Sequence, residues 1–428
     1  MTLANQTATC HRLDMIRSDH NFVRRKAQLA VETALADTRV VLVVGPRQSG
    51  KTTLVRQFAN DARPYFTLDD AATLANARGD PVGFIRNADG AVIDEIQRAP
   101  ELMLVLKMAV DNDPRPGRYL LTGSANVMAL PTVGDSLAGR IEIVELFPFA
   151  QSELLAGRGA FIDRLFAGEH LAADQSLTGA ALMQAILKGG YPEAVARTSE
   201  PRRKEWFNNY VAFTLDRDVR DVAQIEQLDK LPRLVEMLAE QAGQLSNHTS
   251  LATGLQISRA TVVRYLEVLE RLFLLKTLPP WFSNRMSRLI KTPKHHFLDS
   301  GLLAALRGAD GRTLQDDPQR YGPLLESFVA SELRKLAGWS ETRTTLSHFR
   351  TKDGDEVDFV LEGPRGQIVG IEVKASATLR RGDFSGLRKL EAAAGDKFLY
   401  GLLLHDHDRI TPFSERIRGA PVSLLWTA

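Results

Sequence analysis

A glycine-rich stretch in the first part of the chain has residue types and spacing suited to holding phosphate groups. It matches the pattern G-x-x-x-x-G-K-[ST] and lies between a β-branched run, 39–44, and a plausible helix, 53–59. In such a loop, backbone N–H groups and a helix N-terminus surround phosphate oxygens, Lys51 adds a charge for the β- and γ-phosphates, and the Thr52 hydroxyl can ligate Mg²⁺. The sequence therefore predicts ATP and Mg²⁺ as cofactors, with the nucleotide bound by Gly45, Pro46, Arg47, Gln48, Ser49, Gly50, Lys51, Thr52 and Thr53.

Two adjacent acids follow an apolar strand, 91–93, downstream of this loop. We expect Asp94 to hold Mg²⁺ through water, with Thr52 as the direct ligand, and Glu95 to polarise the water that attacks the γ-phosphate. Strands in general often end in solvated acids, but the position after a phosphate-binding loop favours the catalytic interpretation.

A polar turn and an arginine come later in the same region. The turn follows a predicted strand, 119–122, and Ser124 or Asn126 could reach the γ-phosphate from it; the turn could instead simply cap the next helix. Arg140 lies immediately before another predicted strand, 141–146, where it could also bind carbonyl groups at a helix end.

Acids and a lysine in the last third of the chain could form a second metal site. A predicted strand, 356–361, carries Asp358, and the next predicted strand carries Glu372 and Lys374. A glycine-rich turn joins the two strands, so Asp358 should lie beside Glu372. Two such carboxylates can hold Mg²⁺, a neighbouring lysine can activate water for attack on a phosphodiester, and Glu326 on the preceding amphipathic helix is a third candidate ligand. The same arrangement could also persist as a binding module without catalysis.

The segment between these two regions has the pattern of a helix-turn-helix. A serine, Ser258, is the expected N-cap of the second of two closely spaced helices. The predicted helices are 231–242, 247–255 and 259–272, and 274–282 is the predicted wing hairpin. Exposed Arg259, Thr261 and Arg264 could contact DNA, although winged helices also act as protein-interaction spacers.

The composition is typical of a globular protein with a net charge close to zero. The chain has 428 residues, of which 44% are hydrophobic and 25% charged, and its formal net charge is +2. Its length suggests two or three domains, and a charge so close to zero means that any basic site must be local. A single cysteine, Cys10, excludes an internal disulfide framework. With no secretory signal and no apolar stretch of about 18 residues, the expectation is a cytoplasmic protein with no membrane contact.

The motifs taken together resemble those of the AAA+ ATPases, and in particular a prokaryotic group that joins an AAA module to a C-terminal domain of unknown function. The matching segments are GPRQSGKTTL (45–54), VIDEIQ (92–97), LLTGSAN (120–126), LAGR followed by a strand that ends in ELFPF (137–149), GGYPE (189–193), EVDFVLE (356–362) and IEVKA (371–375). The resemblance implies that Arg140 is an arginine finger that reaches a neighbouring subunit's ATP site, and that Ser124 or Asn126 is the sensor. It therefore implies a homo-oligomer, such as a hexamer, because one subunit could not complete its own site.

The C-terminal segment resembles the PD-(D/E)xK nuclease fold. Asp358, Glu372 and Lys374 stand at the matching positions, and Glu326 stands on the preceding helix. One departure is that Glu-Val precedes Asp358 where a proline would match the pattern.

The expected fold class is α/β: a P-loop AAA+ core with a parallel sheet, a helical lid, a winged-helix-like middle region and an α/β restriction-endonuclease-like C-terminal domain. The expected domains are 1–148 for the AAA+ core, 149–222 for the lid and linker, 223–284 for the winged-helix-like domain and 285–428 for the nuclease-like domain. Within the lid, Arg197 is either a nucleotide contact or a solvated residue, and the alternating charges of 216–221 are interpreted as a solvated helix face.

Two functions fit these observations. The first is an ATP-driven machine that binds or processes DNA, with metal-dependent cleavage by the C-terminal domain as a possible further activity. The second is an ATP-dependent regulatory or scaffolding switch whose C-terminal domain is an inactive docking module. Stimulation of ATP turnover by DNA would distinguish the two.

Overall fold

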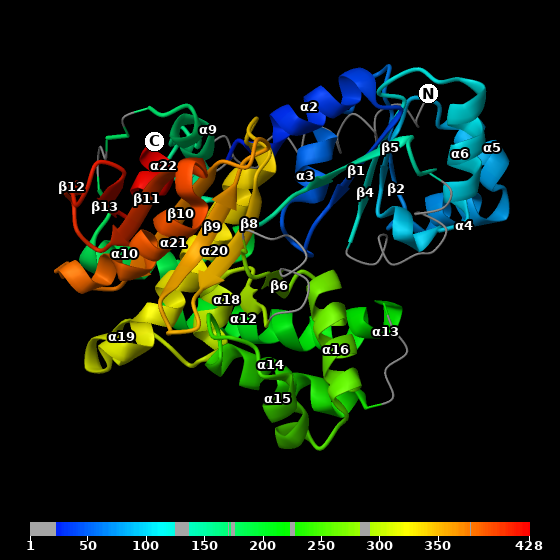
Figure 1. Ribbon diagram of the computed structural model, residues 1–428. Helices are drawn as coiled ribbons and strands as arrows, with labels where there is room; N and C mark the ends of the chain where they lie inside the picture. Colours follow the sequence, from blue (N-terminus) through cyan, green and yellow to red (C-terminus); the bar gives the residue numbers. More distant parts are fainter. Residues whose placement is uncertain are drawn as a thin grey trace.

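Two large β-sheets and a helical region make up the computed structural model of the protein (Figure 1). The residues that the structure describes are 23–124, 137–169, 171–172, 176–222, 227–282, 292–376 and 378–428. The N-terminal sheet (blue to cyan) and the C-terminal sheet (orange to red) lie on opposite sides of the view, and below them lie the green helices α12 (Glu200–Phe213), α14 (Leu231–Glu240), α15 (His248–Leu255) and α16 (Arg259–Arg271). No helix within those ranges is long and apolar enough to cross a membrane.

The N-terminal sheet has the strand order β2-β3-β4-β1-β5, and every neighbouring pair is parallel. Its strands are β1 (Val40–Val44), β2 (Tyr65–Thr67), β3 (Val92–Asp94), β4 (Tyr119–Gly123) and β5 (Ile141–Glu145). Strand β1 lies between β4 and β5, and all five of its residues are buried. A parallel strand covered on both faces needs a continuous apolar run, which explains why the sequence there does not alternate.

Helices cover both faces of this sheet. They are α2 (Ala27–Asp37), α3 (Lys51–Arg56), α4 (Ala71–Gly79), α5 (Pro81–Asn87), η1 (Ile96–Arg98) and α6 (Leu102–Asn112). Because side chains alternate along a strand, Val41 and Val43 join one apolar cluster with α2 and α3, while Leu42 joins the other with α5 and α6. The predicted parallel α/β core is confirmed.

The middle of the chain is helical and ends in a two-stranded sheet. Its elements are α8 (Gln151–Leu154), α9 (Phe161–Phe166), α10 (Gly179–Lys188), α11 (Pro192–Ala196), α12 (Glu200–Phe213), the π-helical turn η3 (Thr214–Asp218), α13 (Val219–Val222), η4 (Leu228–Lys230), α14 (Leu231–Glu240), α15 (His248–Leu255), α16 (Arg259–Arg271), β6 (Leu275–Leu278) and β7 (Lys294–Phe297). Ser258 caps α16 as predicted, because its Oγ accepts a hydrogen bond from the Thr261 N–H at 3.0 Å.

The hairpin prediction over 274–282 was wrong in one respect. Only β6 lies in that range, and its antiparallel partner is β7. Pro279 and Pro280 have no N–H group to donate, so the chain cannot turn back there to form a ladder. It runs instead beside the C-terminal sheet, where the His348 N–H donates to the Pro279 carbonyl at 2.9 Å.

The C-terminal sheet has the order β12-β13-β11-β10-β9-β8. Its strands are β8 (Thr345–Arg350), β9 (Glu356–Glu362), β10 (Ile368–Lys374), β11 (Phe398–His405), β12 (Thr411–Pro412) and β13 (Ile417–Pro421). Strands β8, β9 and β10 are antiparallel neighbours, and β10, β11 and β13 are parallel. The accompanying helices are α18 (Ser300–Leu306), α19 (Gly311–Asp316), η5 (Pro318–Arg320), α20 (Tyr321–Trp339), η6 (Arg381–Phe384), α21 (Ser385–Ala394), η7 (Gly395–Lys397) and α22 (Leu424–Thr427). Side chains from one face of the sheet pack in the apolar cluster that includes α20, and side chains from the other face pack in the cluster that includes α21. The two helices therefore cover opposite faces of the sheet.

Candidate functional site

The glycine-rich loop connects the C-terminal end of β1 to the first turn of α3, as the pattern predicts. Gly50 has φ +93°, a left-handed conformation that glycine adopts without strain. At Gly45, a Cβ atom would lie 2.1 Å from the backbone oxygen of Leu146, so a larger residue cannot occupy the start of the loop. The two glycines therefore allow the loop to close tightly around the N-terminus of α3.

Lys51 is buried at the centre of this loop, with 5% of its surface exposed. Its Nζ donates to the carbonyl oxygens of Gly45 at 3.0 Å and Pro46 at 2.9 Å. Burial lowers the pKa of Lys51 to about 8, against the opposing effect of the nearby carboxylates of Glu95 and Asp94. The loop therefore holds a partly desolvated ammonium group, which phosphate oxygens would stabilise.

The predicted Mg²⁺ residues lie side by side. The Thr52 hydroxyl donates to Asp94 Oδ2 at 2.9 Å, and the Tyr65 hydroxyl donates to the same oxygen at 2.7 Å. The Thr122 hydroxyl donates to Asp94 Oδ1. A hydroxyl next to a fixed carboxylate suits Mg²⁺ held by Thr52 directly and by Asp94 through water, so the donor set fits the ion. The sequence reasoning did not identify Tyr65 or Thr122, which come from β2 and β4.

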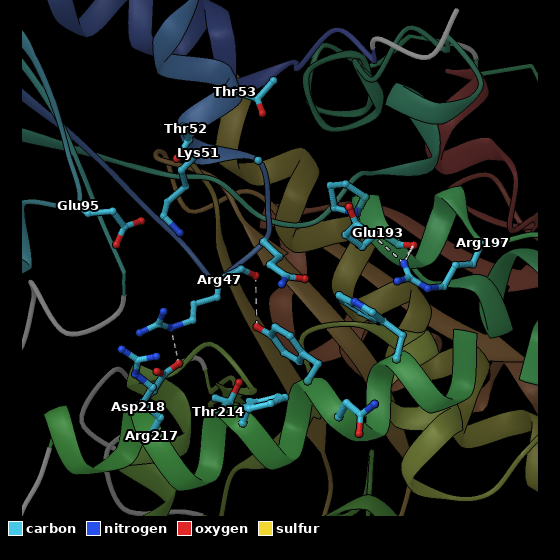
Figure 2. Close-up of a pocket in the computed structure, with 17 residues that line it drawn as sticks. Arg47, Lys51, Thr52, Thr53, Glu95, Glu193, Arg197, Thr214, Arg217 and Asp218 are labelled. Atoms are coloured by element: carbon cyan, nitrogen blue, oxygen red, sulfur yellow. Dashed lines mark hydrogen bonds and ion pairs between the residues drawn. The ribbon is translucent and has the colours of Figure 1, made fainter. Parts of the chain in front are cut away.

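Glu95 has an unusual backbone conformation for a non-glycine residue. Its φ is +61°, and its N–H donates to the Thr122 hydroxyl at 2.9 Å. Gln97 Nε2 donates to the Glu95 carboxylate. Such strained conformations occur often at functional sites, and here the conformation places Glu95 on the wall of the same cavity as Lys51 (Figure 2).

Of the two candidate sensor residues, the structure describes only Ser124. Ser124 is buried directly after β4, and its N–H donates to the Gln97 side chain at 3.3 Å, which links it to the residue that holds Glu95. Asn126 lies outside the described residues.

A cavity of about 820 Å³ separates the loop from α12 (Figure 2). From the predicted set it is lined by Arg47, Gln48, Gly50, Lys51, Thr52, Thr53 and Glu95. The opposite wall includes Trp206 and Tyr210, whose rings stack with centroids 5.3 Å apart, and Phe213, which is 74% exposed. A cavity of this size with charged groups on one wall and aromatic rings on the other suits a nucleotide.

The π-helical turn after α12 contacts the loop directly. Arg47 Nε lies 2.6 Å from Asp218 Oδ2, and Asp218 is only 8% exposed. The interpretation of 216–221 as a solvated face was therefore wrong at Asp218, because the wider winding of a π-helix changes which residues face the loop. Arg217, the preceding residue, also lines the cavity.

A pair of buried tyrosines provides a second link between the loop and the helices. The Tyr191 hydroxyl donates to the Tyr210 hydroxyl at 3.2 Å, and Tyr210 donates to the Arg47 carbonyl at 3.4 Å. Burial raises the pKa of both phenols, so they stay protonated and can donate. Tyr191 belongs to the GGYPE segment, in which the Gly190 N–H donates to Asp299 Oδ2 at 2.7 Å.

Arg25 supports the loop from behind and was missed by the sequence reasoning. Its guanidinium donates to the Ser49 carbonyl at 2.7 Å, to the Phe147 carbonyl at 2.6 Å and to Glu153 Oε1 at 3.0 Å. Both charged side chains are buried. Nothing in the local sequence indicates this contact, because Glu153 is 128 residues away along the chain.

Arg140 lies at the N-terminal end of the parallel strands, whereas the phosphate-binding loop of the same chain lies at their C-terminal end. Its carbonyl accepts a hydrogen bond from the Val40 N–H at 3.2 Å, so it lies beside the first residue of β1, whereas the loop follows the last. Five strand residues span about 16 Å. Arg140 Nη2 binds Asp111 Oδ2 at 3.1 Å, so within one chain it does not reach the cavity.

Arg197, the candidate lid arginine, does line the cavity. Its Nη1 binds Glu193 Oε2 at 2.9 Å, and its guanidinium lies 5.8 Å from the centre of the Trp206 ring. The side chain thus approaches the space expected for the nucleotide from the aromatic wall.

The structure also brings the C-terminal acids together. The register of β9 and β10 pairs Phe359 with Ile371, so Asp358 and Glu372 lie next to each other. Asp358 Oδ2 accepts a hydrogen bond from the Val373 N–H at 2.9 Å. Lys374 Nζ lies 2.7 Å from Glu372 Oε1.

One residue in this acidic centre was not expected. Lys294, the first residue of β7, places its Nζ 3.1 Å from Glu326 Oε1 and 3.2 Å from Asp358 Oδ1. Burial, followed by the Asp358 charge, raises the pKa of Glu326 to about 8, and burial with the same neighbour raises that of Glu372 to about 8. Among the residues described, no group of three or more His, Cys, Asp or Glu side chains is arranged to hold a metal ion. With an ammonium group between the acids, the centre does not fit a divalent cation in this arrangement.

Family models match three parts of the chain. An AAA domain matches residues 37–155, a domain of unknown function (DUF8612) matches 179–313 and another (DUF4143) matches 321–425. The first match includes every residue of the phosphate-binding loop, so this part of the chain is a P-loop AAA domain of the ATPase type.

Relatives match almost the whole chain. The uncharacterised protein Rv2008c of Mycobacterium tuberculosis is 31% identical over 411 residues, which cover 94% of this chain and 85% of that protein. The uncharacterised protein MJ1637 of Methanocaldococcus jannaschii is 26% identical over 419 residues, which cover 89% and 84%. AMPPCP-bound DnaA from Aquifex aeolicus, a solved structure, matches 58% of this chain and 90% of its own at 13% identity, with a TM-score of 0.30. That score is too low to establish a shared overall fold.

Proposed function

Because the chain belongs to the family of the mycobacterial protein Rv2008c and carries an AAA domain, we propose that it hydrolyses Mg·ATP as a homo-oligomer and couples the cycle to DNA binding. The observation that carries the proposal is the cavity between the phosphate-binding loop and α12, which has Lys51, Thr52 and Glu95 on one wall.

Each loop residue has a distinct task in this proposal. Lys51 leaves its carbonyl partners and binds β- and γ-phosphate oxygens, which are stronger acceptors because they are charged. Thr52 and Asp94 hold Mg²⁺, which when bound neutralises charge on the phosphates. Glu95, fixed by its backbone bond to Thr122, orients and polarises the attacking water.

The position of Arg140 supports the oligomer that we propose. It lies about one strand length from the loop of its own chain, so a charge supplied to the γ-phosphate by Arg140 must come from a neighbouring subunit. The pair with Asp111 would hold the side chain in place before subunits meet. Ser124, close to Glu95 through Gln97, is the sensor that we propose.

The middle region supports the DNA-binding part of the proposal. Three helices, α14 to α16, are followed by the antiparallel pair β6 and β7, which is the element order of a winged helix. Arg259 and Arg264 are exposed on α16, where they can reach phosphate oxygens, whereas the Thr261 hydroxyl is already bonded to Ser258 at 2.8 Å.

ATP turnover in the presence and absence of duplex and branched DNA tests the proposal. We expect DNA to stimulate turnover in the wild-type protein and the double variant Arg259→Ala/Arg264→Ala to lose the stimulation while keeping basal turnover. Arg312→Ala is the matched control, because this arginine is exposed on α19, outside the α14–β7 region. The absence of any DNA effect on the wild-type protein would refute DNA coupling.

A second candidate function is favoured by the acidic centre. The C-terminal element order, α20 followed by β8, β9, β10, α21 and β11, supports a PD-(D/E)xK-like fold. With Lys294 between its acids, however, this domain would act as a docking module in an ATP-dependent regulatory switch. A protein partner that is captured only with bound ATP, together with ATP turnover that DNA does not change, would support this candidate over the first.

A further inference from the structure

We propose that the C-terminal domain contains a latent divalent-cation site, formed by Glu326, Asp358 and Glu372, whose cation is replaced by the ammonium group of Lys294. The consequence is that the centre binds no divalent cation as long as β7 is packed against the C-terminal domain. This inference concerns a site separate from the ATPase cavity and does not depend on how the cavity works.

The first support is the position of the ammonium group. Lys294 Nζ lies 3.1 Å from Glu326 Oε1 and 3.2 Å from Asp358 Oδ1, so it bridges an acid on α20 and an acid on β9. A cation shared by two carboxylates in this way fills the place that a metal ion would take between them. Lys294 is 2% exposed, so water does not screen the interaction.

The second support is an acceptor that remains open at the same centre. Glu372 is buried, and its Oε1 accepts from Lys374 at 2.7 Å. Its Oε2 is buried and has no hydrogen-bond partner in the part of the chain that the structure describes. A buried carboxyl oxygen without a hydrogen-bond partner is unfavourable, and a cation bound to the ionised group would satisfy it.

The third support is that the blocking residue comes from another part of the fold. Lys294 begins β7, which pairs with β6 of the middle region. Gly243, which precedes this hairpin in the middle region, packs so closely on Glu326 that a Cβ there would lie 2.8 Å from Glu326 Oε2. The chain between β6 and β7 also bonds to β8, through the His348 N–H and the Pro279 carbonyl. The ammonium group between Glu326 and Asp358 and the backbone that packs on Glu326 therefore come from the middle region.

The charges explain why removal of Lys294 should open the site. Without its ammonium group, three acids would share one centre with Lys374 alone, and their negative charge there is strongly unfavourable unless they take up protons or bind another cation. A divalent cation that binds between Glu326 and Asp358 restores the balance. We therefore expect Lys294→Met to bind Mn²⁺ at least about 100-fold more tightly than the wild-type protein at this centre.

Mn²⁺ binding to the full-length protein without nucleotide, followed by electron paramagnetic resonance, tests the inference. Lys294→Met should gain one bound ion that the wild-type protein lacks, and the added change Asp358→Asn should remove it. Lys294→Arg keeps the positive charge and should gain nothing. Lys276→Met is the matched control, because this lysine lies on β6 of the same hairpin but pairs with Glu145 at 3.0 Å instead of the acids of the centre.

Two results would overturn the inference. One is a Mn²⁺ site in the wild-type protein that Asp358→Asn abolishes, because Lys294 would then not exclude the ion. The other is a folded Lys294→Met protein without an added Mn²⁺ site, because no latent site would then exist. If Lys294→Met does not fold, Lys294→Gln is tested in its place. Mn²⁺ binding by the wild-type protein, compared with that by Asp358→Asn, still shows whether the wild-type centre excludes the ion.

Discussion

Nucleotide affinity should fall as the pH rises above 8, because one amine in the empty site loses its proton there. Burial lowers the pKa of Lys51 to about 8, and the nearby carboxylates of Glu95 and Asp94 offset this effect only in part. When a nucleotide enters, its phosphate oxygens replace the carbonyl oxygens of Gly45 and Pro46 as partners of the ammonium group. Contact with a polyanion raises the pKa of Lys51, so binding takes up a proton in this range.

The magnitude follows from linkage. Below pH 8 the empty site is already protonated, so affinity is at its maximum there. Between the pKa of the empty site, about 8, and the higher pKa of the complex, affinity falls about tenfold for each pH unit. At pH 9 roughly one empty site in ten carries the proton, so the dissociation constant should be about ten times that at pH 7. The nucleotide phosphates do not contribute to the change, because their last pKa lies near 6.

Fluorescent ATP-analogue binding between pH 7 and pH 9.5 measures this profile. Lys51→Arg is the control, because guanidinium stays charged over the whole range and should give a flat profile, even if binding is weaker. Isothermal titration at pH 8.5 in two buffers of different ionisation enthalpy should show that a proton is taken up on binding. A wild-type dissociation constant that changes less than twofold across the range would refute the role that we assign to Lys51 burial.

Three further results are expected. Glu95→Gln should bind ATP normally and lose at least about 100-fold in turnover, because only water activation is removed; near-normal turnover would exclude Glu95 from that role. Arg140→Ala should also bind ATP but turn it over slowly. Mixing it with Glu95→Gln should restore part of the activity, because some interfaces of a mixed oligomer contain an intact Glu95 from one subunit and an intact Arg140 from the other. Co-assembly without any recovery would argue against action between subunits. Arg25→Ala should lower the free energy of unfolding by about 3 kcal/mol in a urea titration, because it removes the ion-pair partner of the buried Glu153 carboxylate. A loss below about 1 kcal/mol would mean that water replaces the contact.

The parts of the site that the sequence predicts are those formed by neighbours along the chain. The loop needs only β1 before it and α3 after it, and both are encoded by short local patterns. The adjacency of Asp358 and Glu372 is also local, because a single glycine-containing turn sets the register of their strands. In these cases the residue spacing alone determines which side chains meet.

The contacts that the sequence does not predict join distant segments. Lys294 is 32 residues from Glu326 and 64 from Asp358, and a lysine at the start of a strand is normally solvated. Asp218 belongs to an alternating-charge run whose burial depends on a π-helical turn, which has no sequence signature as clear as that of an α-helix. In both cases the partner becomes visible only when separate elements are packed together.

Helix α12 connects the two sites described above. At its C-terminal end, the π-helical turn bonds to the loop through Asp218 and Arg47, which line the same cavity. Along its length, Phe207 packs on α18 at Gly301, where a Cβ would lie 2.9 Å from the ring. Helix α18 in turn contacts α20, which carries Glu326. A helix of 14 residues is about 21 Å long, and α12 carries both of these contacts. The contacts thus run without a break from the phosphate-binding loop through α12 and α18 to α20, the helix that carries Glu326.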